Sequence, residues 1–321
     1  MSGQAAPAAA HRLGALDATR GAALVAMAFY HLTWDIKHFR LIDVDLANSA
    51  TFHGIGHAIA SVFVGVAGFS LALAHRDGFN APAFFKRLAL IGGAAVAVTL
   101  VTFYAMPDAY IFFGILHCIA AASLAGALFL RAPLWLIGLV AALAIAAPHA
   151  WRSEAFNSPA LAWIGFAARD PYTYDFRSFF PWFGVFLAGM AAARLGLDAF
   201  FARLPATAAP WRWLALGGRH SLAVYLVHQP VLFGALMLAT MGASQVSYDE
   251  RPFMAFCVEQ CSAAGGPADL CQSACRCSIA GAKKSGLWRA ILEEKLTSAQ
   301  EAQLVEIAGQ CRKIVEEAGP R

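Results

Sequence analysis

Residues 20–36 read RGAALVAMAFYHLTWDI, an apolar segment interrupted near its end by His31 and Asp35. The whole chain of 321 residues shares this character, because 59% of its residues are hydrophobic and 14% are charged, where soluble domains carry about 25% charged residues. A helix needs about 20 mainly apolar residues to cross the hydrocarbon core of a bilayer. The segment is therefore typical of a membrane-spanning helix that holds two ionisable side chains.

Seven apolar runs of about this length follow one another along the chain. They lie at 21–37, 54–74, 88–106, 109–130, 134–151, 179–197 and 221–241. A shorter stretch at 160–167 is typical of a re-entrant or interfacial segment. The first twenty residues lack the apolar core of a cleavable signal peptide, so we expect the first span to stay in the mature protein. The sequence predicts an all-α, polytopic membrane helix bundle of about seven spans in residues 1–245.

Basic residues predict the orientation, because Lys and Arg are retained on the cytoplasmic side of a membrane. With a cytoplasmic N-terminus, ten of them fall in cytoplasmic segments, namely Arg12, Arg20, Arg76, Lys86, Arg87, Arg131, Arg194, Arg203, Arg212 and Arg219. Five fall in outer loops, namely Lys37, Arg40, Arg152, Arg169 and Arg177. Seven crossings then place residues 246–321 outside the cytoplasm.

Residues 246–321 differ in composition and carry six of the seven cysteines: Cys257, Cys261, Cys271, Cys275, Cys277 and Cys311. In an oxidising compartment this pattern indicates a disulfide framework. Two pairs are spaced i, i+4 on either side of the turn sequence AAGGPAD, so antiparallel helices would join Cys261 to Cys271 and Cys257 to Cys275. Cys277 and Cys311 remain for a third bridge, although six cysteines allow fifteen connectivities.

The tail has one alternative interpretation, a zinc site of four thiolates. The oxidising compartment disfavours it, so we expect no metal. Ser298 and Glu301 fit a capping box that opens an amphipathic helix. The sequence therefore predicts a small, cysteine-rich helical domain after the membrane bundle.

Ionisable side chains inside the spans form the candidate site, because charge in hydrocarbon is costly and usually faces the bundle interior. His31 and Asp35 lie one turn apart on one helix face. A carboxylate beside an imidazole can fix its tautomer and raise its basicity. We therefore predict that His31 is a general base and that Asp35 orients it.

Further candidates lie on other spans and are expected between the midplane and the outer leaflet. They are His53 and His57 in the second run, His117 in the fourth, and Tyr225 and His228 in the seventh. His117 and His228 also fit helix-packing hydrogen bonds, and His53 fits an interfacial loop. Near the cytoplasmic side, Arg20 and Arg87 could bind the phosphates of an anionic donor, but topology alone already requires positive charge there.

Five segments carry a resemblance to a known family. They are LDATRGAALVAMAFYHLTWDI, GHAIASVFVGVAGFSLAL, DAYIFFGILHCIA, DFRSFFPWFGVFLAG and GRHSLAVYLVHQP. In this order they resemble the heparan-alpha-glucosaminide N-acetyltransferase catalytic-domain family, within the transmembrane acyltransferases, over residues 13–240.

The glycine-rich runs IGGAAVA and GVAGFSLA are better explained by helix packing than by phosphate binding. We expect no nucleic-acid partner.

The resemblance implies transfer of an acyl group, expected to be acetyl, from cytoplasmic acetyl-CoA to a hydroxyl or amine of an extracytoplasmic glycan or lipid. It implies that His31 removes the acceptor's proton or carries the acyl group, that Asp35 orients it, and that Arg20, His117 and His228 line the donor tunnel. The segment FFPWFG would pack at the outer mouth. The expected location is a bacterial inner membrane, with the tail in the periplasm.

The sequence departs from the family pattern in two ways. An important histidine of the animal members, between the first two spans, has three competing matches here: His38, His53 and His57. The superfamily also has more spans than seven, so the chain is either a reduced version or pairs with a second copy.

Other functions fit the same residues. Intramembrane His and Asp side chains also relay protons in transporters. Histidines on different spans, His31, His57, His117 and His228, could ligate haem b. A membrane anchor for the cysteine-rich tail is the third alternative, in which His31 would have no chemical role.

Overall fold

The computed structural model describes residues 14–39, 41, 49–203, 209–241, 250–292 and 296–318. Most of these residues lie in helices and none lies in a strand, although one isolated bridge joins Ser153 and Ala167. The all-α prediction is confirmed. The chain divides into two compact units, residues 1–39 with 44–239, and residues 40–43 with 240–321. The predicted domain boundary at 245 lies outside the described residues.

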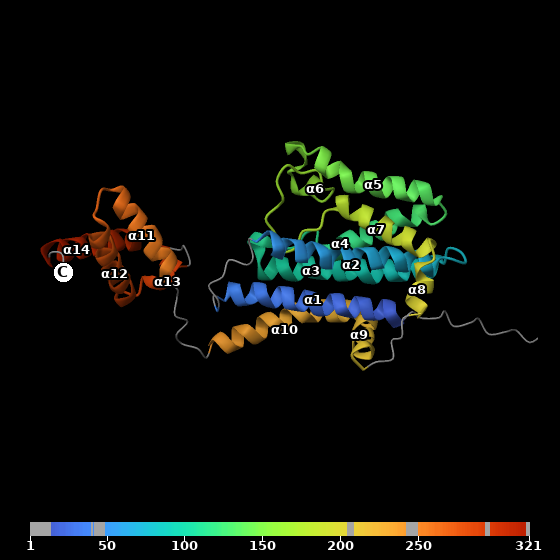
Figure 1. Ribbon diagram of the computed structural model, residues 1–321, viewed down its shortest axis with the longest axis horizontal. Coiled ribbons are helices and arrows are strands. Elements are labelled where there is room, and N and C mark those ends of the chain that lie inside the picture. Colours follow the sequence, from blue (N-terminus) through green and yellow to red (C-terminus); the bar gives the residue numbers. More distant parts are fainter. Residues whose placement is uncertain are drawn as a thin grey trace, which may run out of the picture. The chain divides into compact units, whose positions relative to one another are not determined.

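A helix lies at each of the seven apolar runs (Figure 1). These helices are α1 (Gly14–His38), α2 (Ala50–Ala74), α3 (Ala81–Ala105), α4 (Ile115–Gly126), α5 (Leu134–Ala150), α7 (Phe179–Arg194) and α10 (Ser221–Met241). Shorter helices connect them: α6 (Pro159–Ala162), α8 (Leu197–Arg203) and α9 (Ala209–Arg219), with 3-10 turns at Pro107–Ala109, Ala127–Phe129 and Glu154–Phe156.

Several helices of this unit have the character of membrane spans. In the described part of the chain, α2, α3 and α10 are long and apolar enough to cross a membrane, and α7 with α8, bent by 72°, would make a fourth. The apolar helices α4 and α5 are shorter. Large apolar side chains such as Phe29, Val101 and Trp135 are 64–69% exposed, as lipid-facing residues are. Seven crossings remain a prediction.

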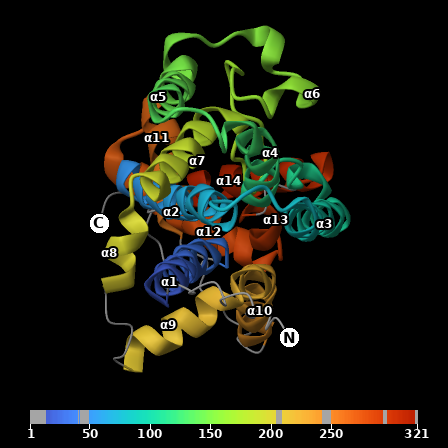
Figure 2. The ribbon, with the colours of Figure 1, turned by 90° about the vertical axis from the view of Figure 1, so that its right-hand side faces the viewer.

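Glycines set the closest helix contacts around α2, which Figure 2 shows between α7 and α1. A Cβ added to Gly68 of α2 would lie 2.0 Å from the carbonyl oxygen of Phe186, and one added to Gly189 of α7 would lie 2.0 Å from that of Gly65. Small residues let helix backbones touch in this way inside membranes. The packing role expected for GVAGFSLA is therefore confirmed, whereas Gly92 and Gly93 of IGGAAVA face open space.

The start of α1 and the end of α9 make a similar contact. A Cβ on Gly21 would lie 1.9 Å from the Leu214 carbonyl oxygen, and one on Gly218 would lie 1.8 Å from that of Asp17. This contact fixes the position of the polar residues that precede Gly21 on α1.

The fourth helix begins later than its apolar run suggests. The run starts at residue 109, but α4 begins at Ile115, after a 3-10 turn and an extended Gly114. The Ile115 N–H donates a hydrogen bond of 2.9 Å to Asp175 Oδ2, from a segment 60 residues away. A carboxylate at a helix N-terminus stabilises it through the unpaired backbone N–H groups.

The second unit contains α11 (Arg251–Ala263), α12 (Ala268–Lys284), α13 (Trp288–Leu292) and α14 (Ser298–Ala318). Its disulfides join Cys257 to Cys275, Cys261 to Cys271 and Cys277 to Cys311, with Cα–Cα distances of 5.6–5.9 Å. The expected pairing is confirmed, and the alternative of a four-thiolate zinc site is wrong because these sulfurs are bonded to one another.

The capping box of α14 lies one residue earlier than predicted. Thr297 and Gln300 form it, because the Gln300 N–H donates to Thr297 Oγ1 at 3.4 Å and Gln300 Oε1 accepts from the Thr297 N–H at 2.9 Å. Ser298 is then the first helical residue rather than the cap. Thr-x-x-Gln and Ser-x-x-Glu both fit the pattern, so the sequence alone does not choose between them.

Candidate functional site

A cavity of about 300 Å³ lies among α1, α2, α3, α4, α9 and α10. Three guanidinium groups line it, those of Arg20, Arg87 and Arg219. Its other walls are mainly apolar, with Phe63, Val66, Ala67, Leu90, Ile91, Ile115, Leu116, Ile119 and Leu222. Tyr225 of α10 also borders it. The cavity therefore combines a positively charged end with an apolar passage.

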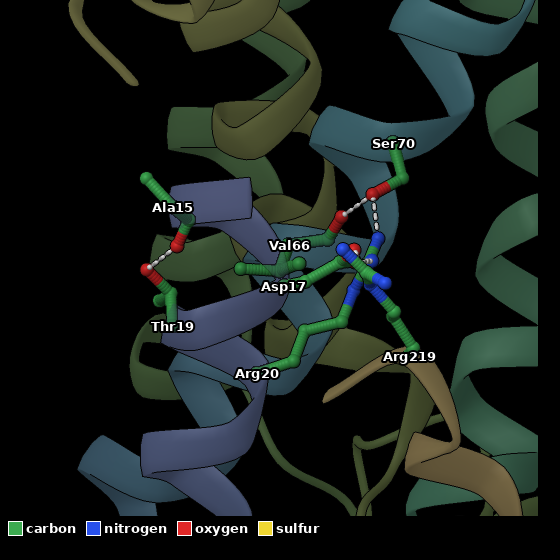
Figure 3. Close-up of polar contacts among 7 residues, drawn as sticks. All are labelled: Ala15, Asp17, Thr19, Arg20, Val66, Ser70 and Arg219. Atoms are coloured by element: carbon green, nitrogen blue, oxygen red, sulfur yellow. Dashed lines mark hydrogen bonds and ion pairs between the residues drawn. The ribbon is translucent and has the colours of Figure 1, made fainter. Parts of the chain in front are cut away.

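Asp17 positions two of these guanidinium groups, as Figure 3 shows. Arg20 donates from Nη1 to Asp17 Oδ1 at 2.8 Å and from Nη2 to Ser70 Oγ at 2.5 Å. Ser70 in turn donates to the Val66 carbonyl oxygen at 2.6 Å. Arg219 Nε lies 3.6 Å from Asp17 Oδ2, and the Asp17 side chain is only 3% exposed.

The cavity keeps an excess of positive charge. Arg87 has no ion pair with any residue that the structure describes, so Asp17 is set against three guanidinium groups. Arginine binds phosphate groups through paired N–H donors. This end of the cavity is therefore suited to a phosphorylated ligand.

A row of rings leads from the cavity to the first-span histidine. The Tyr225 ring, which borders the cavity, lies 5.7 Å from the His228 ring, and the His228 ring lies 5.1 Å from that of His31. His228 Nδ1 is 2.6 Å from the Tyr225 carbonyl oxygen. The predicted candidates Tyr225, His228 and His31 are thus brought together between α1 and α10.

Asp35 is fully buried, and it accepts a hydrogen bond from a residue other than His31. Gln229 Nε2 donates to Asp35 Oδ1 at 2.8 Å across the same pair of helices. Sequence reasoning gave Asp35 the task of orienting His31, and the structure places it instead with Gln229, which that reasoning did not single out.

His117 is part of the local structure at the start of α4. Its Nδ1 accepts a hydrogen bond from the Gly114 N–H at 3.2 Å, and its Nε2 lies 3.1 Å from Thr99 Oγ1. Because Nδ1 is the acceptor, the proton is assigned to Nε2, which donates to Thr99. Both ring nitrogens are engaged, so the packing interpretation of His117 describes it better than donor binding or haem ligation.

His53 and His57 are exposed, and neither makes a ring contact with His31 among the described residues. Each contacts the backbone carbonyl four residues earlier through Nδ1, and the His57 ring alone joins an aromatic cluster by stacking on Trp182 at 5.7 Å. The Arg177 guanidinium lies 5.8 Å from the centre of the same Trp182 ring. Phe179 and Phe183 stack within FFPWFG at 4.7 Å. The side chain of His38, the third competing histidine, is outside the described part.

Comparison with known proteins gives one match. A family model described as heparan-alpha-glucosaminide N-acetyltransferase, catalytic, matches residues 12–230, which is more than half of the chain. The chain belongs to this family. No curated protein and no solved structure matches it.

The match covers every element of the site in this family member, from Asp17 on α1 to Gln229 on α10, and ends before the cysteine-rich tail. Membership implies an acetyltransferase type of activity in a membrane protein. In the described ranges, histidine, cysteine, aspartate and glutamate form no cluster of three that could hold a metal ion.

Sequence reasoning missed four residues: Asp17 and Gln229 of the site, Asp175 at the start of α4, and Arg177 beside Trp182. Asp17 lies three residues before Arg20, a spacing that places an opposite charge on the same helix face and that could have been noticed. The other three depend on contacts between segments far apart in the sequence, and no local pattern announces them.

Proposed function

We propose that the protein is an integral membrane acetyltransferase that takes the acetyl group from cytoplasmic acetyl-CoA and transfers it to a hydroxyl or amine of an extracytoplasmic glycan or lipid. The observation that carries this proposal is the row Tyr225, His228 and His31, which begins at the wall of the arginine-lined cavity. Membership of the acetyltransferase family supports it independently.

The donor would lie with its phosphates at Arg20, Arg87 and Arg219 and its pantetheine arm along the apolar wall. Arg20 and His31 are eleven residues apart on α1, which corresponds to about 16 Å along a helix. An extended pantetheine arm covers such a length. The thioester then reaches His31 while the charged nucleotide stays at the membrane surface, where burial costs least.

His31 would act as the general base. Its imidazole removes the proton from the acceptor's hydroxyl or amine, the freed lone pair attacks the thioester carbonyl carbon, and the C–S bond breaks. The CoA thiolate leaves and takes up a proton, which the imidazolium can return. His228 Nδ1 donates to a backbone carbonyl, so its Nε2 presents a lone pair near His31.

The decisive experiment measures CoA release from acetyl-CoA by the purified protein in lipid nanodiscs. We expect His31→Ala to lower the rate at least about 100-fold, the usual size of a general-base contribution, without changing the thermal unfolding temperature. His149→Ala, at an exposed histidine on α5, is the matched control and should retain full activity. Equal rates for wild type and His31→Ala would overturn the mechanism.

A further inference from the structure

Three polar atoms at the α1–α10 interface are buried and have no hydrogen-bond partner among the described residues. They are Asp35 Oδ2, Gln229 Oε1 and His228 Nε2. Burying a polar group without a hydrogen-bond partner costs about 1–3 kcal/mol, so native structures contain few such groups. Those that do occur often have a function, such as binding a ligand or taking part in catalysis. Their occurrence on consecutive residues of α10 and on the facing residue of α1 indicates a ligand-binding function.

All three atoms are hydrogen-bond acceptors. The Asp35 carboxylate can only accept hydrogen bonds, so Gln229 must donate to it from its NH₂ group. The amide oxygen Oε1 of Gln229 is then an acceptor without a donor. His228 donates from Nδ1 to the Tyr225 carbonyl oxygen, so in the neutral ring Nε2 carries the lone pair. A ligand that satisfies these atoms must therefore bring N–H or O–H donors.

The three acceptors lie next to the proposed reaction centre. The His31 and His228 rings are 5.1 Å apart, and Asp35 follows His31 by one helical turn, about 6 Å along α1. Asp35 is fully buried, so a group bound to it is held away from water.

We propose that Asp35 and Gln229 bind the acceptor of the acetyl group, by accepting hydrogen bonds from its amine or hydroxyl groups beside His31. This assignment rests on the proposed acetyltransferase function. The acceptor then has a head group with several N–H or O–H donors, such as a sugar ring. Ether, ester or alkyl head groups would be rejected, because they leave the buried acceptors unpaired.

Two sugars test the proposal because they differ in a single group: D-glucosamine carries an amine where D-glucose carries a hydroxyl. CoA release from acetyl-CoA is measured in nanodiscs over a range of each sugar. We expect at least one sugar to accelerate release by the wild-type protein with saturation. Acceleration by both would assign the site to hydroxyl groups, and acceleration by D-glucosamine alone would assign it to the amine.

Asp35→Asn keeps the size of the side chain and its acceptor towards Gln229 but replaces Oδ2 by an NH₂ donor. We expect the KM for the sugar to rise at least 10-fold while the KM for acetyl-CoA stays unchanged. Gln229→Met removes the second hydrogen-bond acceptor and serves as the test if Asp35→Asn fails to fold. It should likewise raise the KM for the sugar and leave the KM for acetyl-CoA unchanged. Val231→Ala, at an exposed position two residues further along α10, is the control and should leave both KM values unchanged.

The outcomes separate this proposal from the function on which it rests. Unchanged sugar KM values in both variants would overturn it, as would a wild-type protein that responds to neither sugar. An equal change of both KM values together with a lower unfolding temperature would show a structural role and would also overturn it. Loss of the proposed function itself would appear differently, as CoA release that does not depend on His31.

Discussion

At the scale of single residues, Asp17 holds two of the three guanidinium groups that line the cavity. Its buried carboxylate contacts both Arg20 and Arg219, which would otherwise repel each other. Asp17→Asn keeps the shape but removes the charge. We expect it to lower the free energy of unfolding by about 1–3 kcal/mol and to raise the KM for acetyl-CoA about 10-fold, because the guanidinium groups lose their fixed positions. Chemical denaturation and CoA-release kinetics measure the two effects.

Asp198→Asn is the matched control for this prediction. It removes a carboxylate that pairs with Arg76 at 2.8 Å, but the Arg76 side chain is 51% exposed. Such pairs contribute about 0–1 kcal/mol, and this one does not border the cavity. A loss of acetyl-CoA affinity in Asp198→Asn as large as in Asp17→Asn would show that the effect is general to charge removal.

The sequence identified some residues of the site and missed their partners. His31 and Asp35 are conspicuous because ionisable residues are rare inside apolar runs, and that rarity alone marked them. Their partners are not visible in this way, since the contact of Asp35 with Gln229 spans 194 residues and depends on how α1 and α10 are aligned. His117 is equally conspicuous in the sequence, but it is not part of the site. Its contacts with Gly114 and Thr99 show that it belongs to the start of α4.

At the scale of helices, the length and apolarity of each run located every long helix of the first unit, because burial in lipid requires both. Helix ends were less predictable. The start of α4 depends on Asp175, which approaches from another segment, and α9 is too short and polar to stand out as a span. The tail was predicted more completely, because the i, i+4 cysteine spacing on either side of one turn favours the two pairings that the structure contains.

The contact between α2 and α7 gives a prediction at this scale. Gly68→Ala would place a methyl group against the Phe186 carbonyl, a backbone atom that cannot move aside cheaply. We expect a loss of about 1–3 kcal/mol in unfolding free energy, measured in detergent or nanodiscs. Gly92→Ala in α3 faces open space and should instead stabilise the protein, because alanine favours a helix over glycine by about 1 kcal/mol. Equal stability of the two variants would contradict the close packing.

At the scale of the whole molecule, two independent patterns agree on orientation. The count of basic residues predicts that the tail lies outside the cytoplasm, and three disulfides are typical of an oxidising compartment. The remaining cysteine, Cys118, is buried in α4 and unpaired. We therefore expect six disulfide-bonded cysteines on the extracytoplasmic side of the membrane. The seventh, Cys118, should be inaccessible to reagents from either side.

This difference predicts the result of thiol counting in cells with a permeabilised outer membrane. We expect no tags from a membrane-impermeant maleimide before reduction, and six tags per chain after treatment with an impermeant phosphine, because only the tail disulfides are then opened. Denaturation in detergent should add the seventh tag at Cys118. The alanine variant of Cys118 should stop at six under all conditions. A tail that accepts tags only after cell lysis, without a reductant, would place it in the cytoplasm and reverse the proposed direction of acetyl transfer.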